Sequence, residues 1–479
     1  MNGKKEYRNI LQKTSVFGYV QLVSLLTGIV RSKIAAFWLG TQGVGILGLL
    51  SSSFSLIIAI TSFGLPTSII KLLSKETDDE TITRKIYVIS KIICILGIIG
   101  SLLCFIFSKQ LSSLAFDTDD FTWAFQLLSV SVFFKQIFSG YISIFQATNK
   151  LKLLANVNII ANIVGILITI PLYYYFRING IFYNFLIITI VEVIIIYFAL
   201  KYNNYAKIRV HKKEIIQEAK PILSSSITFS FTGTITLLSI YLVQVYISKS
   251  GNLEEVGLYI AAFTILNSYI GLIFVVMGNE YFPRIAKNSI TSPVLNQNVN
   301  QQLYIGLLFV FPMLLWLITL APLIINILYS ESFSDSVYLM KIASLGIFFK
   351  VFSWTLGYVI LVKASNRFII SNSTLFNFIF LAFHIAGFYF YGLIGVAYAF
   401  SLYFFIHFIG NLFITYQKFN FRMSKEITNY LIISGALLVI NILISLILES
   451  NLTSYIFNAA SALIISLLAL NKILYIYKK

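Results

Sequence analysis

The sequence has few charged side chains and, among them, few acids. Only 11% of its 479 residues are charged, against about 25% in an ordinary soluble domain, and Asp and Glu together number 18. Hydrophobic residues make up 58% of the chain. Apolar runs long enough to cross a hydrocarbon core of about 30 Å as a helix recur from residue 14 to residue 476. The shortage of charge therefore excludes a soluble protein and predicts a polytopic membrane protein.

Cysteines and nucleotide-binding motifs are also scarce. The two cysteines, Cys94 and Cys104, lie in one predicted helix, too far apart along the chain for a disulfide with its Cα spacing of about 5.5 Å. The sequence has no GxxxxGK[ST] segment, so it does not predict direct coupling to ATP. We predict no cofactor and no metal site.

The charges that are present lie mainly on one side of the predicted spans, although a net charge of +17 would by itself also suit a nucleic-acid-binding protein. We predict fourteen spans, starting near residues 14, 43, 86, 121, 152, 180, 220, 255, 300, 336, 368, 393, 428 and 453. With the N-terminus inside, only Lys109, Arg177 and Lys249 fall on the outer side. This positive-inside bias predicts two cytoplasmic termini and accounts for the basic charge without a nucleic-acid partner.

Short matches between the two halves of the chain indicate an internal repeat. The matching segments are FFK at 133–135 and 348–350, ATNK at 147–150 with ASNR at 364–367, and GIFYNF at 180–185 with GVAYAF at 395–400. Their offsets are 215 or 217 residues. Because each repeat has an even number of spans, we predict parallel repeats related by an axis along the membrane normal, with the substrate site at their interface.

The repeat divides the chain into four parts. We predict an N-lobe of six spans at 1–200, a basic cytoplasmic linker at 201–219, a C-lobe of six spans at 220–416, and an unrepeated helix pair at 417–479. The predicted fold is therefore an all-α, two-lobe membrane protein with six plus six spans and an appended pair.

Two segments carry a family resemblance. RSKIAAFWLGTQGVG at 31–45 combines a basic helix end, a glycine turn and a second helix that begins at once, and GNEYFPRIAK at 278–287 closes the eighth predicted span. Both resemble O-antigen flippases of the Wzx type, within the multidrug/oligosaccharidyl-lipid/polysaccharide (MOP) exporter superfamily. The resemblance covers about residues 10 to 416 and implies a V-shaped transporter that works by alternating access.

The resemblance also implies a substrate and a location. We expect the chain to move undecaprenyl-diphosphate-linked oligosaccharide units, of O-antigen or capsule type, from the cytoplasmic to the periplasmic leaflet of the bacterial inner membrane. H+ and Na+ both stay open as the coupling ion. The resemblance implies work beside a polymerase and a chain-length regulator, and we expect a monomer surrounded by membrane lipid.

Six cations lie within predicted spans and are our candidates for substrate binding: Arg31, Lys33, Lys91, Lys135, Lys341 and Lys350. An ionised side chain at the centre of a membrane helix costs about 2.5–3.5 kcal/mol, so it usually faces a cavity or a partner. The acids at similar depth are only Glu192 and Glu280. We therefore predict a basic cavity that receives an anionic head group.

Lys135 and Lys350 occupy equivalent positions of the two repeats. Each lies about 20 Å from the cytoplasmic helix end, too deep for easy snorkelling. Lys135 also belongs to a polar stripe with Ser131, Ser139 and Ser143 at i, i+4 spacing. We predict that the two lysines hold a diphosphate from both lobes. The alternative is that each pairs with carbonyls or an acid inside its own lobe.

Arg31 and Lys33 leave two interpretations open. They lie in the outer third of the first span, where Arg31 would bind a phosphate bidentately. Alternatively, they reach the outer interface or pair with the acids of the DTDD loop at 117–120.

Four residues are candidates for ion coupling: Glu192, His384, His407 and Glu280. Histidine, or a desolvated glutamate, titrates near neutrality, as a proton-linked transporter requires. Glu192 corresponds to His407 by the offset of 215. The alternative is that these are packing residues and that Glu280 pairs with Arg284 at i, i+4.

Three other functions stay as alternatives. A lipid II-type flippase carries a similar anionic head group, so charge does not separate it from our prediction. A cation-coupled multidrug exporter needs a buried carboxylate in its lobe cavity, and spans one to four contain none. A membrane glycosyltransferase or polymerase would use the DTDD loop, but such enzymes usually have a large outer loop, whereas each outer loop here is short. We therefore predict a transporter with no catalytic residues.

Overall fold

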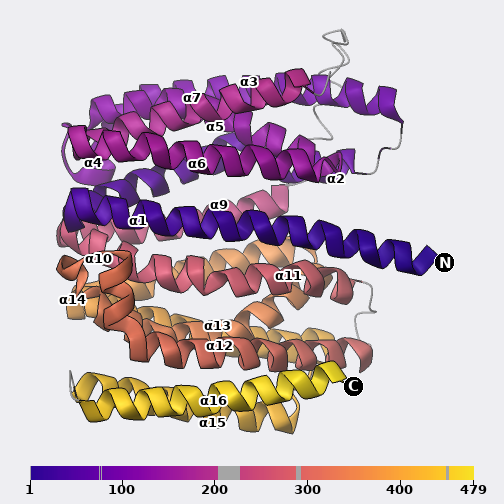
Figure 1. The fold of residues 1–479 in the computed structure, drawn as a ribbon, viewed down its shortest axis with the longest axis vertical. Coiled ribbons are helices and arrows are strands. Elements are labelled where there is room, and N and C mark those ends of the chain that lie inside the picture. The colour runs from indigo at the N-terminus through magenta and orange to yellow at the C-terminus, as the bar shows by residue number, and fades with distance from the viewer. Residues whose placement is uncertain are drawn as a thin grey trace. The chain divides into compact units, whose positions relative to one another are not determined.

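The computed structural model describes residues 2–74, 76, 78–202, 227–286, 293–448 and 452–478. Across these ranges the secondary structure is helical, with no strand (Figure 1). The chain divides into two compact units, Met1–Leu253 and Glu254–Lys479, which we call unit 1 and unit 2.

Unit 1 contains eight of the described helices. They are α1 (Asn2–Ser62), α2 (Leu65–Leu73), α3 (Asp79–Ile106), α4 (Ser108–Phe116), α5 (Thr122–Ala147), α6 (Leu151–Phe176), α7 (Asn179–Tyr202) and α9 (Ile227–Ser250).

Unit 2 contains the remaining described helices. They are α10 (Leu253–Thr264), the π-helix η1 (Ile265–Tyr269), α11 (Gly271–Ala286), α12 (Pro293–Leu328), the 3-10 helix η2 (Glu331–Phe333), α13 (Ser336–Lys363), α14 (Asn366–Phe419), α15 (Lys425–Ile447) and α16 (Leu452–Lys478).

Twelve helical stretches of the described chain are long and apolar enough to cross a membrane. Two of them, α1 and α14, each consist of two helices joined at a glycine with a positive φ, Gly40 (φ 68°) and Gly392 (φ 59°). Only glycine adopts this backbone region without strain, so these two positions end one crossing and begin the next. Counted as two helices each, these two stretches bring the total over the described chain to fourteen, which is the number of spans that the sequence predicts, including the separate ones near residues 14 and 43.

The internal repeat is visible in backbone conformation. Arg177, between α6 and α7, has φ 49° and ψ −127°, and Gly392, 215 residues later, has φ 59° and ψ −147°. The glycines that follow, Gly180 and Gly395, are also 215 apart, and a Cβ on either would collide with a carbonyl oxygen of the preceding helix. The same tight turn thus joins the fifth and sixth helices of both repeats, as the sequence offset predicts.

The hydrophobic core of unit 1 surrounds α5. One cluster of buried residues joins α5 to α2 and α3, and a second cluster joins it to α6 and α7. Ser131 and Ser143 of the predicted polar stripe are buried, so that face of α5 looks into protein. Lys135 is therefore carried by the central helix of the unit.

In unit 2, α13 has the corresponding central place. It packs against α11, α12, α14 and α15, and Figure 1 shows α15 and α16 side by side next to α12. Lys350 lies on α13, between the fully buried Phe348 and Phe352. Each lysine thus lies on a helix that packs against several others of its own unit.

The predicted linker at 201–219 lies outside the described residues except for its start. The division of the chain falls after Leu253, so unit 1 includes α9, whereas the predicted C-lobe begins at 220 and would include it. Within unit 1, α9 packs against α1 and α4. The predicted lobe boundaries stay predictions.

Candidate functional site

Lys135 forms an ion pair inside unit 1. Its Nζ donates to both oxygens of Glu192, at 2.7 Å to Oε1 and 2.9 Å to Oε2, which joins α5 to α7. The Glu192 side chain is only 10% exposed and that of Lys135 is 32% exposed. The ammonium also lies 4.8 Å from the ring centroid of Phe138. Of the two interpretations that the sequence leaves for Lys135, the structure shows pairing with an acid of its own unit.

Arg31 lies in the same part of unit 1. Its Nη2 donates to the carbonyl oxygen of Asn162 on α6 at 3.1 Å, and the Asn162 amide in turn donates to Ser24 Oγ at 3.2 Å. The guanidinium also interacts electrostatically with Glu192. Its Nε is buried and has no hydrogen-bond partner among the residues that the structure describes. Arg31, Lys135 and Glu192 together carry a net charge of +1, held at membrane depth.

Gly165 makes room for the guanidinium. A Cβ at this position of α6 would collide with Arg31 Nη2. Close approach of the helix backbone therefore depends on glycine here. In the sequence, neither Asn162 nor Gly165 is marked as a partner of Arg31, because both lie more than 130 residues further along the chain.

Lys350 has a different environment in unit 2. Its Nζ donates to Asn267 Oδ1 at 2.9 Å and lies near two aromatic rings, 5.8 Å from the centroid of Phe274 and 5.3 Å from that of Phe404. Across the described chain it forms no ion pair with an acid. Within the described chain, its positive charge is therefore stabilised by an amide dipole and by the negative faces of aromatic rings rather than by a carboxylate.

A π-helical turn carries Asn267. The turn η1 interrupts the helical run between α10 and α11, with Ile270 donating to the Ile265 carbonyl at 3.1 Å in the i to i+5 pattern. Such turns shift the helix face by one residue and occur often at functional sites. The polar pair Asn267 and Ser268 inside an apolar run is the only signal for this turn in the sequence.

Residue 407 shows how the repeats differ. Glu192 pairs with Lys135, whereas its counterpart His407 accepts from Asn411 Nδ2 at 3.3 Å and stacks on Tyr403 at 5.5 Å. Asn411 also donates to the Ser353 carbonyl at 3.0 Å. Position 407 therefore carries an imidazole that contacts an amide, where the first repeat carries an acid that contacts a lysine.

His384 is a buried packing residue. It is 1% exposed, its Nδ1 lies 2.7 Å from the Phe380 carbonyl oxygen, and its ring packs at 3.8 Å on the Phe380 ring. Its Nε2 has no hydrogen-bond partner within the described ranges. These contacts separate it from the ion pair and from Lys350.

The remaining predicted residues are dispersed. Lys91 is exposed beside the Tyr87 ring, Lys33 is half-buried in α1, and buried Lys341 donates to the Ser445 carbonyl at 3.0 Å. Glu280 pairs with Arg284 at 3.3 Å, the i, i+4 contact named as its alternative.

The acids of the DTDD loop contact cations and a hydroxyl. Asp117 pairs with Lys249 at 3.1 Å and Asp119 with Lys109 at 3.0 Å, while Asp120 accepts from Thr118 Oγ1 at 2.8 Å. The described ranges hold no cluster of three or more His, Cys, Asp or Glu that would bind a metal ion. Arg31 interacts with Asn162 rather than with this loop.

Comparison with known proteins supports a family assignment. The model of the family described as "Polysaccharide biosynthesis protein" matches residues 10–289, which is more than half of the chain. That stretch contains Arg31, Lys135 and Glu192. No curated protein matches the sequence.

Solved structures of transporters share the fold. The lipid II flippase MurJ, in an inward closed conformation, is 15% identical with a TM-score of 0.69, over 98% of this chain and 100% of that one. A mutant of the Vibrio cholerae MATE transporter VcmN is 14% identical with a TM-score of 0.58, over 86% and 97%. A MOP superfamily transporter from Pyrococcus furiosus is 13% identical with a TM-score of 0.59, over 84% and 95%. These likenesses confirm the MOP-type fold predicted from the sequence.

Proposed function

Because the chain belongs to the polysaccharide biosynthesis protein family, we propose that it is a flippase for undecaprenyl-diphosphate-linked oligosaccharide units of the O-antigen or capsule type. It would move them by alternating access from the cytoplasmic to the periplasmic leaflet of a bacterial inner membrane, with both termini in the cytoplasm. The MOP-type transporter fold supports this mechanism. A polymerase and a chain-length regulator would take the product on the periplasmic side.

The environment of Lys350 carries the proposal. A lysine about 20 Å from the helix end, with a neutral amide as its hydrogen-bond partner, keeps a full positive charge available to an incoming anion. Each hydrogen bond to a charged group contributes about 1.5–3 kcal/mol. A diphosphate supplies several anionic acceptors of this kind, whereas an uncharged or cationic drug supplies none.

The ion pair in unit 1 suits a coupling role. A proton on Glu192 would remove the negative charge that holds Lys135 and would leave two uncompensated cations, Arg31 and Lys135, in unit 1. Protonation would therefore raise the affinity of unit 1 for an anion. We propose H+ as the coupling ion on this ground, with Na+ at the same carboxylate as the alternative.

The multidrug-exporter alternative is disfavoured by the same contact. A cationic substrate needs a carboxylate that is free to attract it, and the Glu192 carboxylate accepts two hydrogen bonds from Lys135. The lipid II alternative shares the diphosphate chemistry, so only the transported sugar separates it from our proposal.

The test uses Lys350→Gln in cells from which the resident O-antigen or capsule flippase has been deleted. Loss of the lysine hydrogen bond should reduce flipping about 10- to 100-fold, with lipid-linked repeat units accumulating on the cytoplasmic side. The matched control is Lys363→Gln, at the end of the same helix α13, which should leave surface polysaccharide unchanged.

Two outcomes would contradict the proposal. Full activity of Lys350→Gln would remove this lysine from substrate binding. Failure of the wild-type protein to restore polysaccharide, together with transport of lipid II in reconstituted vesicles, would establish the lipid II alternative instead.

A further inference from the structure

The segment that joins α14 to α15 has a fixed shape. Asn420 ends α14 in the left-handed conformation (φ 53°), and the Phe421 N–H donates to the Thr415 carbonyl at 3.2 Å, six residues back. The left-handed residue at the helix end thus turns the chain so that the next residue folds back onto the helix. Phe421 is accordingly only 3% exposed.

Two amides of α12 hold the rest of the segment. The Arg422 N–H donates to Asn296 Oδ1 at 3.2 Å, and Asn300 Nδ2 donates to the Arg422 carbonyl at 3.0 Å. The Ser424 N–H donates to Asn300 Oδ1 at 2.9 Å. Because both its N–H and its carbonyl are hydrogen-bonded to side chains of α12, Arg422 lies in a rigid connection rather than in a free loop.

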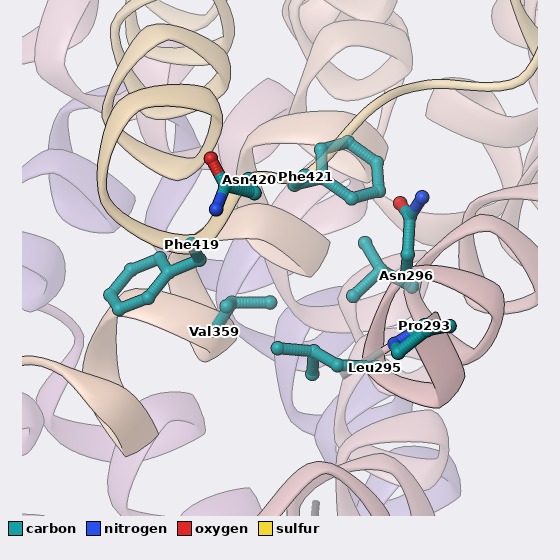
Figure 2. Close-up of a pocket in the computed structure, with 8 residues that line it drawn as sticks. Pro293, Leu295, Asn296, Val359, Phe419, Asn420 and Phe421 are labelled. Atoms are coloured by element: carbon teal, nitrogen blue, oxygen red, sulfur yellow. The ribbon is translucent and has the colours of Figure 1, made fainter. Parts of the chain in front are cut away.

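Hollows lie on both sides of Phe421. Figure 2 shows the first, a pocket of about 240 Å³ with Phe419 and Asn296 on opposite sides. The second is an open groove of about 440 Å³, lined by Ile409, Leu412, Phe413, Tyr416, Phe421, Arg422 and Met423. All of its lining residues except Arg422 are apolar or aromatic, so the groove is an apolar surface with one cation beside it.

The cations around the groove have no acidic partner in the described chain. Arg422 and Lys425 are exposed and form no ion pair there, although Glu426 is close in sequence. Lys418, in the last turn of α14, lies over the Phe368 ring at 3.7 Å. By the positive-inside rule this end of α14 faces the cytoplasm, where anionic lipids create a negative surface potential.

We propose that this groove binds an anionic phospholipid of the phosphatidylglycerol type, with one acyl chain along α14 and the phosphate on Arg422. The apolar wall matches an acyl chain, and Tyr416 lies where aromatic residues mark the membrane interface. Lys425, three residues after Arg422, is a second exposed cation close in sequence to the groove. The site is separate from Lys350 and does not depend on the transported substrate.

The length of the groove favours a membrane phospholipid over a polyprenyl diphosphate. From Ile409 to Tyr416 the helix rises only about 10 Å, which accommodates the upper part of one acyl chain. A much longer polyprenyl chain would leave most of its length outside the groove. It would therefore gain little binding free energy in the groove compared with an ordinary phospholipid.

The experiment measures lipid binding to the purified full-length protein by native mass spectrometry. The probes are phosphatidylglycerol and phosphatidylcholine with identical acyl chains. About 1 kcal/mol per cation near a lipid surface corresponds to a fivefold change in affinity. We expect the wild type to prefer phosphatidylglycerol at least fivefold, and Arg422→Gln to lose that preference.

Arg367→Gln is the matched control, since Arg367 is an exposed arginine at the start of the same helix α14. It should keep the preference. Ile409→Trp, which fills the groove, should weaken both lipids. Equal losses in Arg422→Gln and Arg367→Gln would overturn the proposal, because they would show non-specific surface charge. Tighter binding of undecaprenyl phosphate than of phosphatidylglycerol would overturn the choice of ligand.

Discussion

The ion pair between Lys135 and Glu192 predicts how substitutions of the two residues change the free energy of unfolding. Lys135→Gln leaves the carboxylate of Glu192 only 10% exposed and without its cation. Removing one partner of a buried ion pair costs about 3–5 kcal/mol, and the 32% exposure of Lys135 lowers this because water screens the charge in part. We therefore expect Lys135→Gln to lower the free energy of unfolding by about 2 kcal/mol.

The double variant Lys135→Gln/Glu192→Gln separates charge from packing. Neither glutamine is charged, and two amides can hydrogen bond to each other, so most of the lost stability should return. Thermal unfolding of the purified protein measures both effects. A loss of about 2 kcal/mol corresponds to a lower Tm by about 4–8 °C, taking a unit of this size as the unfolding domain.

The charge-swapped variant Lys135→Glu/Glu192→Lys provides the functional control. It should keep the thermal stability of the ion pair while placing the acid on α5, and flipping should fall if α7 must carry the titrating group. Equal destabilisation of Lys135→Gln and of the double glutamine variant would refute the reasoning, since the cost would then not come from an unpaired charge.

Three further substitutions test particular contacts. Gly392→Ala should lower the free energy of unfolding by about 1–3 kcal/mol, because the φ of 59° at this position strains any residue other than glycine. Arg177→Gly, at the equivalent turn of the first repeat, should not lower it, and Tm values of the two variants measure the difference. Gly165→Ala should displace the Arg31 guanidinium. The rate of flipping should therefore fall clearly, while Tm falls only a little. Asn300→Ala removes two hydrogen bonds to the segment before α15 and should cost about 1–3 kcal/mol, together with weaker retention of phosphatidylglycerol.

Much of the fold could be predicted because it depends on local composition and on the offset between repeats. Long apolar runs determine the number of candidate spans, and the glycines at 40 and 392 mark two of the turns between them. The offset of 215 identifies equivalent residues without any knowledge of packing. The structure bears this out in the matched backbone angles of Arg177 and Gly392.

The partners of the buried charges could not be predicted in the same way. Whether Lys135 meets Glu192 depends on how α5 and α7 are rotated about their own axes, and α7 is apolar on nearly all sides. Similarly, Asn267 reaches Lys350 from a π-helical turn, which shifts the helix face relative to any regular pattern. Spacing along the chain therefore identifies candidate residues, and the packing of the helices decides which of these residues form pairs.

The difference between Glu192 and His407 yields a last prediction about how the repeats have diverged. If Lys350 binds an anion because no acid compensates it, His407→Glu should introduce into unit 2 the acid that unit 1 already has. Lys350 and His407 both lie beside the Phe404 ring, at 5.3 Å and 6.3 Å from its centroid, so a carboxylate at 407 would act on the same ammonium.

We expect His407→Glu to reduce flipping at least tenfold while His407→Gln, which is neutral and of similar size, retains it. Surface polysaccharide and accumulated lipid-linked units measure the effect, and Tm identifies any variant that simply unfolds. Equal activity of the two variants would show that charge at 407 does not reach the substrate. Loss in both would point to the hydrogen bond with Asn411, and therefore to packing between α13 and α14, as the role of His407.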